Sequence, residues 1–359
     1  MEKGQADHYN YIDYLRAVGM FLVAWPHLTV NLNPTWQPLL IVQWFFNRPL
    51  SITQNFGALG VYIFFLISGF LMCEPSRRSP KAPGWYFLYK VGGVLLPLWG
   101  AMLTFFLFTK GIELLFGFQC WWSQFSVLDW IKSATLYPYI KGTTDLVNSV
   151  LWFLFPLLLF ILLDALYRIF SKEPSLYFVI FSMLVIVLCF CLQSFLPISI
   201  CANLTYIPVM LWGYLINLWH RRSISWKKAF SYGILCYGLM LVGFYQFFNY
   251  YYEEEPYMLS AILALLLFII MHLTRSPVQA PKIVKFLSSI SYSFYIIHSL
   301  YGGMIISALF SHIPYGLALI CGVSVSIIMA YINYRYVERP IKAGLVFFAE
   351  RVNGIYERH

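Results

Sequence analysis

YIDYLRAVGMFLVAWPHLTV, residues 11–30, is the first long apolar stretch of the chain, and it contains both an arginine and a histidine, Arg16 and His27. On an α-helix eleven residues are close to three turns, so the two side chains lie on one face, about 16 Å apart along the axis. Ionisable groups inside a membrane span usually face a bundle interior or a water-filled cavity, and they mark functional paths. The stretch therefore predicts a membrane-spanning helix with a polar path along one face.

The composition indicates an integral membrane protein. Of the 359 residues 60% are hydrophobic and 11% are charged, and the mean hydropathy is +0.69, whereas a soluble domain carries about 25% charged residues. We expect an all-α, polytopic membrane helical bundle that forms a single domain over residues 1–359, with the first apolar stretch retained as a span. Apolar runs of about twenty residues predict ten transmembrane helices, near residues 12–31, 56–73, 91–109, 148–168, 175–193, 204–219, 229–249, 257–273, 286–310 and 315–334.

The distribution of charge predicts the orientation. With a cytoplasmic N-terminus, the inner segments hold 20 of the 24 lysines and arginines, whereas an outer segment holds Glu253, Glu254 and Glu255. The positive-inside rule therefore predicts that both termini are cytoplasmic. The same basic loops account for the net charge of +9 without a nucleic-acid partner. The longest segment between spans, residues 110–147, is rich in aromatic residues, which predicts an interfacial or re-entrant helix rather than a soluble domain.

The ninth predicted span carries a polar stripe. Ser291, Tyr295 and His298 share one helix face, and Gly302 continues it, which would let another helix approach closely. A hydrogen bond to the neighbouring backbone is the structural alternative for His298.

Other polar residues in the spans also have structural explanations. Ser68 and Gly69 in the second span are typical of a packing notch. Asp164 precedes Arg168 by one turn, which predicts an ion pair at the inner interface. The seven cysteines lack metal-ligand spacing, so no metal site is predicted.

His27 is the strongest candidate for chemistry. It follows Pro26, which removes a backbone donor and obstructs the carbonyl of Leu22, so the helix should kink or end there. Irregular backbone in a span is tolerated only where it lies against protein or lines a cavity. Histidine is the usual general base for activating a hydroxyl, because its pKa is near neutral. The structural alternative is a histidine that caps the broken helix.

Five segments in order resemble the acyltransferase-3 family of membrane acyltransferases. They are YIDYLRAVGMFLVAWPH, with an arginine and a histidine separated by ten residues; GVYIFFLISGF; LWFLFPLLLF; SISYSFYIIH; and YVERPIK. Together the matches run from residue 12 to residue 342, nearly the whole chain.

The resemblance implies a membrane O-acyltransferase that moves an acyl group from cytoplasmic acyl-CoA, chiefly acetyl-CoA, to a carbohydrate hydroxyl beyond the cytoplasmic membrane of a bacterium. It implies a catalytic role for His27 together with Arg16. The residues expected to bind the acceptor are Ser68, Trp152, Ser291, Tyr295 and His298. Those expected to bind the donor are Arg16, Arg77, Arg78 and Lys90.

One departure from the family pattern concerns the donor. The family usually has Arg-Arg-x-x-Arg-x-x-Pro after the second span. In YKVGGVLLP, residues 89–97, Lys90 precedes Pro97 and Val94 occupies the position of the last arginine. The departure bears on how a CoA phosphate is held and on which donor is used.

Two alternatives remain at this point. Ten spans with buried polar groups also suit an exporter of a lipid-linked sugar, although matched broken helices in the two halves are not evident. The third alternative is a family member that has lost catalysis and acts as a structural partner.

Overall fold

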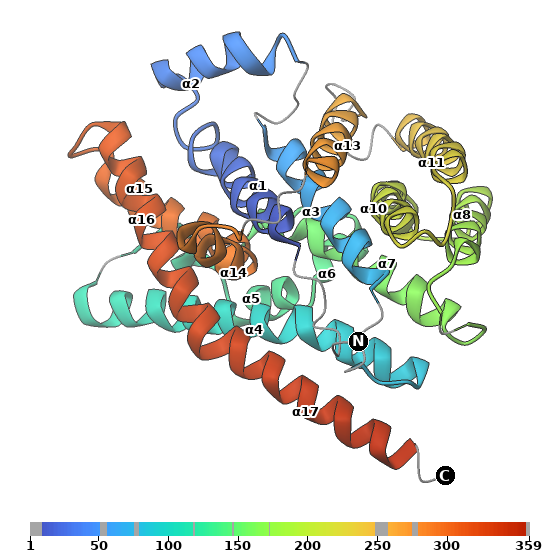
Figure 1. The fold of residues 1–359 in the computed structure, drawn as a ribbon. Helices are drawn as coiled ribbons and strands as arrows, with labels where there is room; N and C mark the ends of the chain where they lie inside the picture. Colours follow the sequence, from blue (N-terminus) through green and yellow to red (C-terminus); the bar gives the residue numbers. More distant parts are fainter. Residues whose placement is uncertain are drawn as a thin grey trace.

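The computed structural model describes residues 9–50, 56–74, 79–117, 119–145, 147–171, 173–247, 258–274 and 279–356. Within these ranges the chain is helical and contains no β-strand, which confirms the all-α class (Figure 1). The ends of two predicted spans, 229–249 and 257–273, extend beyond the described residues.

A helix occupies each of the ten apolar stretches. These helices are α1 (Asn10–Leu28), α3 (Gly57–Met72), α4 (Pro83–Phe116), α7 (Leu154–Tyr167), α8 (Leu176–Cys191), α10 (Ile207–His220), α11 (Trp226–Gln246), α13 (Met258–Leu273), α14 (Lys282–Ile297) and α16 (Tyr315–Asn333). By length and composition, six helical stretches of the described residues are suited to cross a membrane: Pro83–Phe116, Ser149–Tyr167, Ile198–His220, Trp226–Gln246, Lys282–Leu309 and Tyr315–Gly354. The apolar helices α3, α8 and α13 are shorter.

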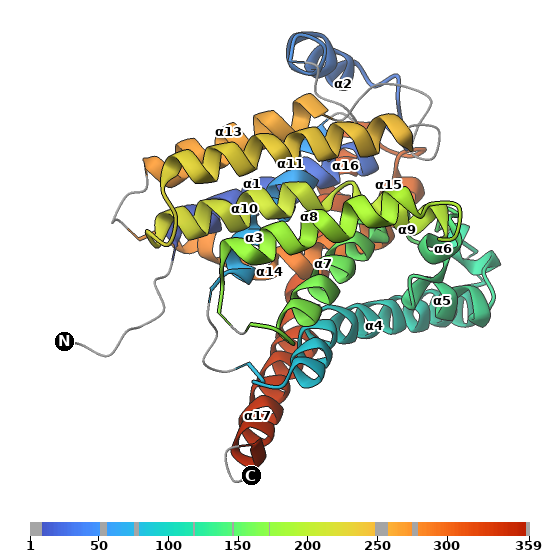
Figure 2. The same cartoon turned by 90° about the vertical axis from the view of Figure 1, so that its right-hand side faces the viewer.

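Short elements join or extend these helices. They are α2 (Gln37–Val42), α5 (Val127–Ala134), α6 (Tyr137–Lys141), α9 (Ile198–Leu204), α15 (Gly303–Leu309), α17 (Arg339–Tyr356), the 3-10 turns η3 (Trp121–Gln124) and η4 (Ser149–Phe153), and the π-helical turns η1 (Gln43–Asn47), η5 (His298–Gly302) and η6 (Tyr334–Glu338). In Figure 2 α8, α10, α11 and α13 run side by side, whereas α17 extends away from them. The bundle thus has one regular side and one side where long helices cross it.

Helix α3 lies at the centre and packs on α1, α10 and α13. Glycines make the closest of these contacts. A Cβ atom added to Gly69 would be 1.7 Å from the carbonyl oxygen of Met210, and one added to Gly213 would be 2.0 Å from that of Leu66. Because small residues let helix backbones approach in a membrane, these two glycines hold α3 against α10. Gly69 is therefore the packing notch that the sequence suggested.

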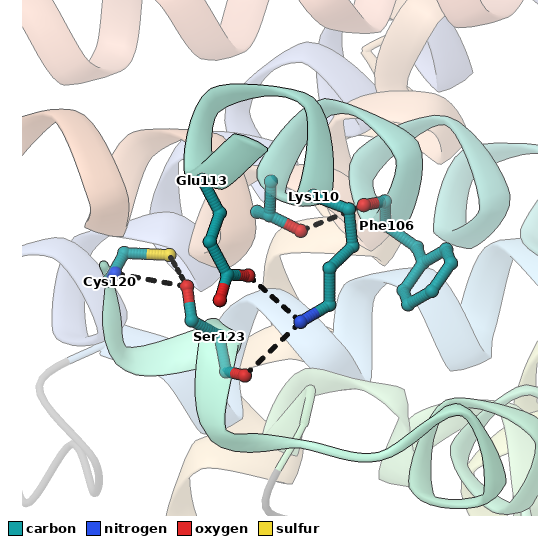
Figure 3. Close-up of polar contacts among 6 residues, drawn as sticks. Phe106, Lys110, Glu113, Cys120 and Ser123 are labelled. Carbon is teal, nitrogen blue, oxygen red and sulfur yellow. Dashed lines mark hydrogen bonds and ion pairs between the residues drawn. The ribbon is translucent and has the colours of Figure 1, made fainter. Parts of the chain in front are cut away.

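The end of α4 is tied to the segment that follows it (Figure 3). The Lys110 ammonium lies 2.9 Å from Oε2 of Glu113 and 3.4 Å from the carbonyl oxygen of Ser123. The backbone N–H of Cys120 donates to Oγ of Ser123 at 3.1 Å. The first residues of the predicted interfacial segment, 110–116, thus belong to α4, and η3, α5 and α6 follow it. The position of these elements at the membrane surface stays a prediction.

The predicted ion pair of α7 is confirmed. Nε of Arg168 lies 3.0 Å from Oδ2 of Asp164. The same oxygen accepts a hydrogen bond from Tyr86 of α4 at 2.5 Å, and the Arg168 guanidinium lies 3.9 Å from the Tyr86 ring centroid. This buried cluster joins α4 to α7.

Candidate active site

A polar cavity of about 370 Å³ lies where α1, α3, α14 and the η6–α17 junction meet. Four of its lining residues carry charge: Arg16, Glu338, Arg339 and Lys342. Three of these are cations and one is an anion, so the lining favours an anionic ligand. Arg339 and Lys342 are exposed at the edge of the cavity, whereas Arg16 is half-buried.

The predicted stripe on α14 forms one wall of this cavity. Ser291 and Tyr295 line it, and Ser68 of α3 faces them. The Ser291 hydroxyl donates to the carbonyl oxygen of Ser288 at 2.8 Å, and the Ser68 hydroxyl donates to that of Phe64 at 2.7 Å. Each hydroxyl oxygen can still accept a hydrogen bond from a ligand. The structure thus brings together four residues that were predicted for the site, namely Arg16, Ser68, Ser291 and Tyr295.

Glu338 is the acidic centre of the cavity, and sequence reasoning did not assign it a role. Its side chain is 1% exposed. Oε2 accepts a hydrogen bond from Ser293 at 2.6 Å, and Oε1 lies 2.5 Å from Nζ of Lys342. Glu338 also interacts electrostatically with Arg16. In the sequence Glu338 belongs to the Val-Glu-x-Pro part of YVERPIK. That segment resembles the family, but no function was assigned to it.

Two carboxylates lie near enough to Arg16 to interact with its charge, and Glu338 is one of them. Asp13, one turn earlier on α1, also interacts electrostatically with Arg16. Oδ1 of Asp13 accepts a hydrogen bond from Ser288 of α14 at 2.7 Å. The arginine is therefore balanced by acids from both ends of the chain, which lowers the cost of its partial burial.

The two candidate histidines form a pair. The ring centroids of His27 and His298 are 5.4 Å apart. His298 is fully buried, and its Nδ1 lies 3.0 Å from the carbonyl oxygen of Phe294. A carbonyl only accepts, so Nδ1 carries the proton and Nε2 is an acceptor. Among the described residues Nε2 has no hydrogen-bond partner, and His298 does not line the polar cavity.

The end of α1 agrees with the prediction made from Pro26. The helix ends at Leu28, two residues after the proline. Nδ1 of His27 lies 3.4 Å from Nδ2 of Asn31, in the turn beyond the helix. The His27 ring therefore sits at an irregular end of the helix, next to another helix's histidine.

Tyr295 connects the cavity with the histidine pair. It lines the cavity, its hydroxyl donates to the carbonyl oxygen of Val150, and its ring centroid is 6.2 Å from that of His298. The π-helical turn η5 begins at His298, and such turns occur often at functional sites. A Cβ on Gly302 would be 2.6 Å from Oγ of Ser326 in α16, so the predicted close helix approach at Gly302 is confirmed.

Four predicted residues of the described chain do not line this cavity: His27 and His298, which form the histidine pair beyond Tyr295, and Trp152 and Lys90. Trp152 packs on Tyr206, with ring centroids 5.1 Å apart. Lys90 lies beside the α4–α7 cluster, with Nζ 5.5 Å from the Tyr86 ring centroid. Arg77 and Arg78 lie outside the described residues.

The position of the missing family arginine is next to the cavity. The hydroxyl of Tyr292, a lining residue, donates to the backbone carbonyl of Val94 at 2.5 Å. Arg339 and Lys342, which sequence reasoning did not single out, supply cations at the edge of the same cavity. Their sequence signal was the YVERPIK segment, which contains both residues.

Comparison with known proteins gives one match. The profile of one protein family, described as an acyltransferase domain, matches residues 9–335. No curated protein and no solved structure matches the chain.

Proposed function

Because the chain belongs to the acyltransferase-3 family, and is therefore a membrane acyltransferase, we propose that it moves an acetyl group from cytoplasmic acetyl-CoA to a hydroxyl of an extracytoplasmic or lipid-linked carbohydrate. The observation that carries this proposal is the order in which polar groups lie in space along α1. A basic cavity edge leads to Arg16, and the pair of His27 and His298 follows three turns further on. The family match favours this reaction over sugar export.

The orientation is part of the proposal. We infer ten spans with both termini cytoplasmic, in the cytoplasmic membrane of a bacterium, because the basic residues concentrate in alternate segments. The edge of the cavity at Arg339 and Lys342 then faces the cytoplasm, where CoA esters are made. The histidine pair lies deeper, toward the outer half of the membrane.

The donor phosphates would bind at the cavity edge. Arg339 and Lys342 are exposed cations that line the cavity, and Arg16 lies inside it. Guanidinium and ammonium groups hold phosphates through charge-assisted hydrogen bonds. We propose that these residues replace the motif arginine that Val94 does not provide, with Arg77 and Arg78 as further contacts. The rise from Arg16 to His27, about 16 Å, suits the length of a pantetheine arm.

The chemical step would use His27 as the general base. The imidazole takes the proton of the acceptor hydroxyl while that oxygen attacks the thioester carbonyl carbon. The tetrahedral intermediate collapses, the C–S bond breaks, and the CoA sulfur receives the proton from His27. Arg16 would stabilise the negative charge of a phosphate or carbonyl oxygen. Ser68, Ser291, Tyr295 and His298 would contact the acceptor.

The test of the chemical step is acyl transfer by the His27→Ala variant. The purified protein, in bilayers with radiolabelled acetyl-CoA, should release or transfer the label, and the variant should lose about 10²–10⁴-fold of this rate. His312→Ala is the matched control, because His312 is exposed and does not line the cavity. An unchanged rate in a folded His27→Ala variant would overturn the proposal.

The test of the donor site separates binding from chemistry. Arg339→Ala should raise the KM for acetyl-CoA about threefold to fivefold with kcat unchanged, since exposed ion pairs contribute up to about 1 kcal/mol. Arg335→Ala is the control, because this cation lies on the adjacent turn and does not line the cavity. Equal effects of the two variants would show that the KM depends on the overall positive charge and not on a site, which would contradict the proposed donor position.

A further inference from the structure

An apolar groove opens on the side of the bundle away from the polar cavity. It lies between α10, α11 and α13, which run side by side in Figure 2. Its volume is about 660 Å³, and its lining has no charged residue. From Trp226 to Tyr237, both in the lining, α11 rises by about 16 Å. Half of a hydrocarbon core of about 30 Å is about 15 Å, so the groove has the length of one leaflet's lipid tail.

A second, polar cavity adjoins one end of this groove. It has a volume of about 450 Å³, and Trp219 and Trp226 line both spaces. Its other lining residues include the cations Arg222 and Lys228 and the hydroxyl of Ser223. The tryptophans therefore divide one continuous site into an apolar part and a basic part.

Among the described residues, neither Arg222 nor Lys228 forms an ion pair. The neighbouring Arg221 points elsewhere, since its Nη1 donates to the carbonyl oxygen of Cys73 at 3.0 Å. The basic part of the site is thus complementary to an anion that comes with the apolar tail.

We propose that this site binds one anionic phospholipid of the cytoplasmic leaflet. One acyl chain lies in the groove between α10 and α11, and the phosphate lies between Arg222 and Lys228. Tryptophan is enriched at membrane–water boundaries, and cytoplasmic basic residues attract anionic headgroups. Each part of the site thus lies at the depth that the matching part of the lipid occupies.

Two glycines of α11 allow a matched test of the tail position. Gly233 lines the groove, and a Cβ added there meets only Trp212 atoms at 3.9 Å, an ordinary contact. Gly238 does not line the groove, and a Cβ added there has no neighbour within 4 Å. Gly233→Leu should therefore fill the groove without disturbing the fold, and Gly238→Leu is the control on the same helix.

Arg222 allows a test of the headgroup position. Its φ is 59°, in the left-handed region that glycine adopts without strain. Arg222→Gly therefore removes the cation while the backbone keeps a favourable conformation. Lys228→Ala is the second headgroup variant.

The experiment is native mass spectrometry of the full chain released from bilayers of equal phosphatidylglycerol and phosphatidylcholine with identical tails. The wild type and Gly238→Leu should retain one phosphatidylglycerol in about tenfold preference. Arg222→Gly and Lys228→Ala should lose the preference but still bind lipid, and Gly233→Leu should lose the retained lipid. No preference in the wild type, or equal retention by Gly233→Leu and Gly238→Leu, would overturn the proposal. So would displacement of the lipid by inorganic phosphate, or a change of oligomeric state in Gly233→Leu.

Discussion

Replacing Gly69 by alanine tests how closely α3 and α10 must pack. The added Cβ would be 1.7 Å from the carbonyl oxygen of Met210, whereas even close C–H···O contacts keep about 3.3 Å. The helices must therefore separate locally by about 1.6 Å. Because the opposing atom belongs to the backbone, no change of rotamer relieves the contact.

The magnitude follows from two opposing effects. Overpacking costs about 1–3 kcal/mol, and a rigid backbone contact lies at the upper end of that range. Alanine recovers up to about 1 kcal/mol through its higher helix propensity. The net loss is about 2 kcal/mol, which corresponds to a fall in Tm of about 3 °C for a chain of 359 residues.

The assay is thermal unfolding of the full chain in one lipid or detergent, followed by circular dichroism and tryptophan fluorescence. Gly238→Ala is the control, because nothing lies within 4 Å of its added Cβ, and its Tm should stay the same or rise slightly. Acyl transfer by Gly69→Ala should also fall, since Ser68 is the adjacent residue and lines the cavity. A Gly69→Ala variant that melts with the wild type would refute the packing argument.

Three further outcomes follow from the site and its surroundings. His298→Gln should lower kcat about tenfold to a hundredfold with little change in the KM for acetyl-CoA. The reason is that His298 lies next to the general base His27, and residues in contact couple by about 0.5–3 kcal/mol. An unchanged kcat in steady-state assays would remove His298 from the mechanism. Val94→Arg should lower the KM for acetyl-CoA about threefold by returning a cation beside the cavity, and a raised KM would contradict the proposed donor position. Asp164→Asn should destabilise the protein by about 3 kcal/mol in thermal unfolding, since the Arg168 guanidinium would lose its buried carboxylate partner. An unchanged Tm would contradict this and would mean that water solvates the guanidinium in place of the carboxylate.

Features that depend on residues close together along the chain could be predicted from the sequence. Asp164 and Arg168 are one turn apart on a helix, so their ion pair required only helical geometry. Pro26 marked the end of α1 by the same local reasoning. His27 and His298 were each predicted as polar residues of spans, and the family resemblance joined them in one site.

The basic edge of the cavity could not be predicted in this way. Arg339 and Lys342 meet Arg16 only after the last helices pack against the first, and hydropathy does not rank one basic residue over another. Lys90 and Trp152 were predicted by resemblance, but Lys90 lies near the Tyr86 ring of its own helix, Trp152 packs on Tyr206, and neither lines the cavity. Order along the chain identifies segments, whereas side-chain direction depends on tertiary packing.

The π-helical turn at 334–338 makes the cavity sensitive to chain length rather than to composition. Each residue of an α-helix rotates the following side chains by about 100°, and a π turn accommodates a residue that an α turn does not. Deleting one residue from this turn would let the helix continue while it swung Arg339 and Lys342 away from Arg16. Such a variant would keep both cations, their spacing and the hydropathy of the segment. The variant would nevertheless lose the cavity edge. A one-residue deletion at 334–338 in a related sequence would therefore affect the site more than many substitutions would.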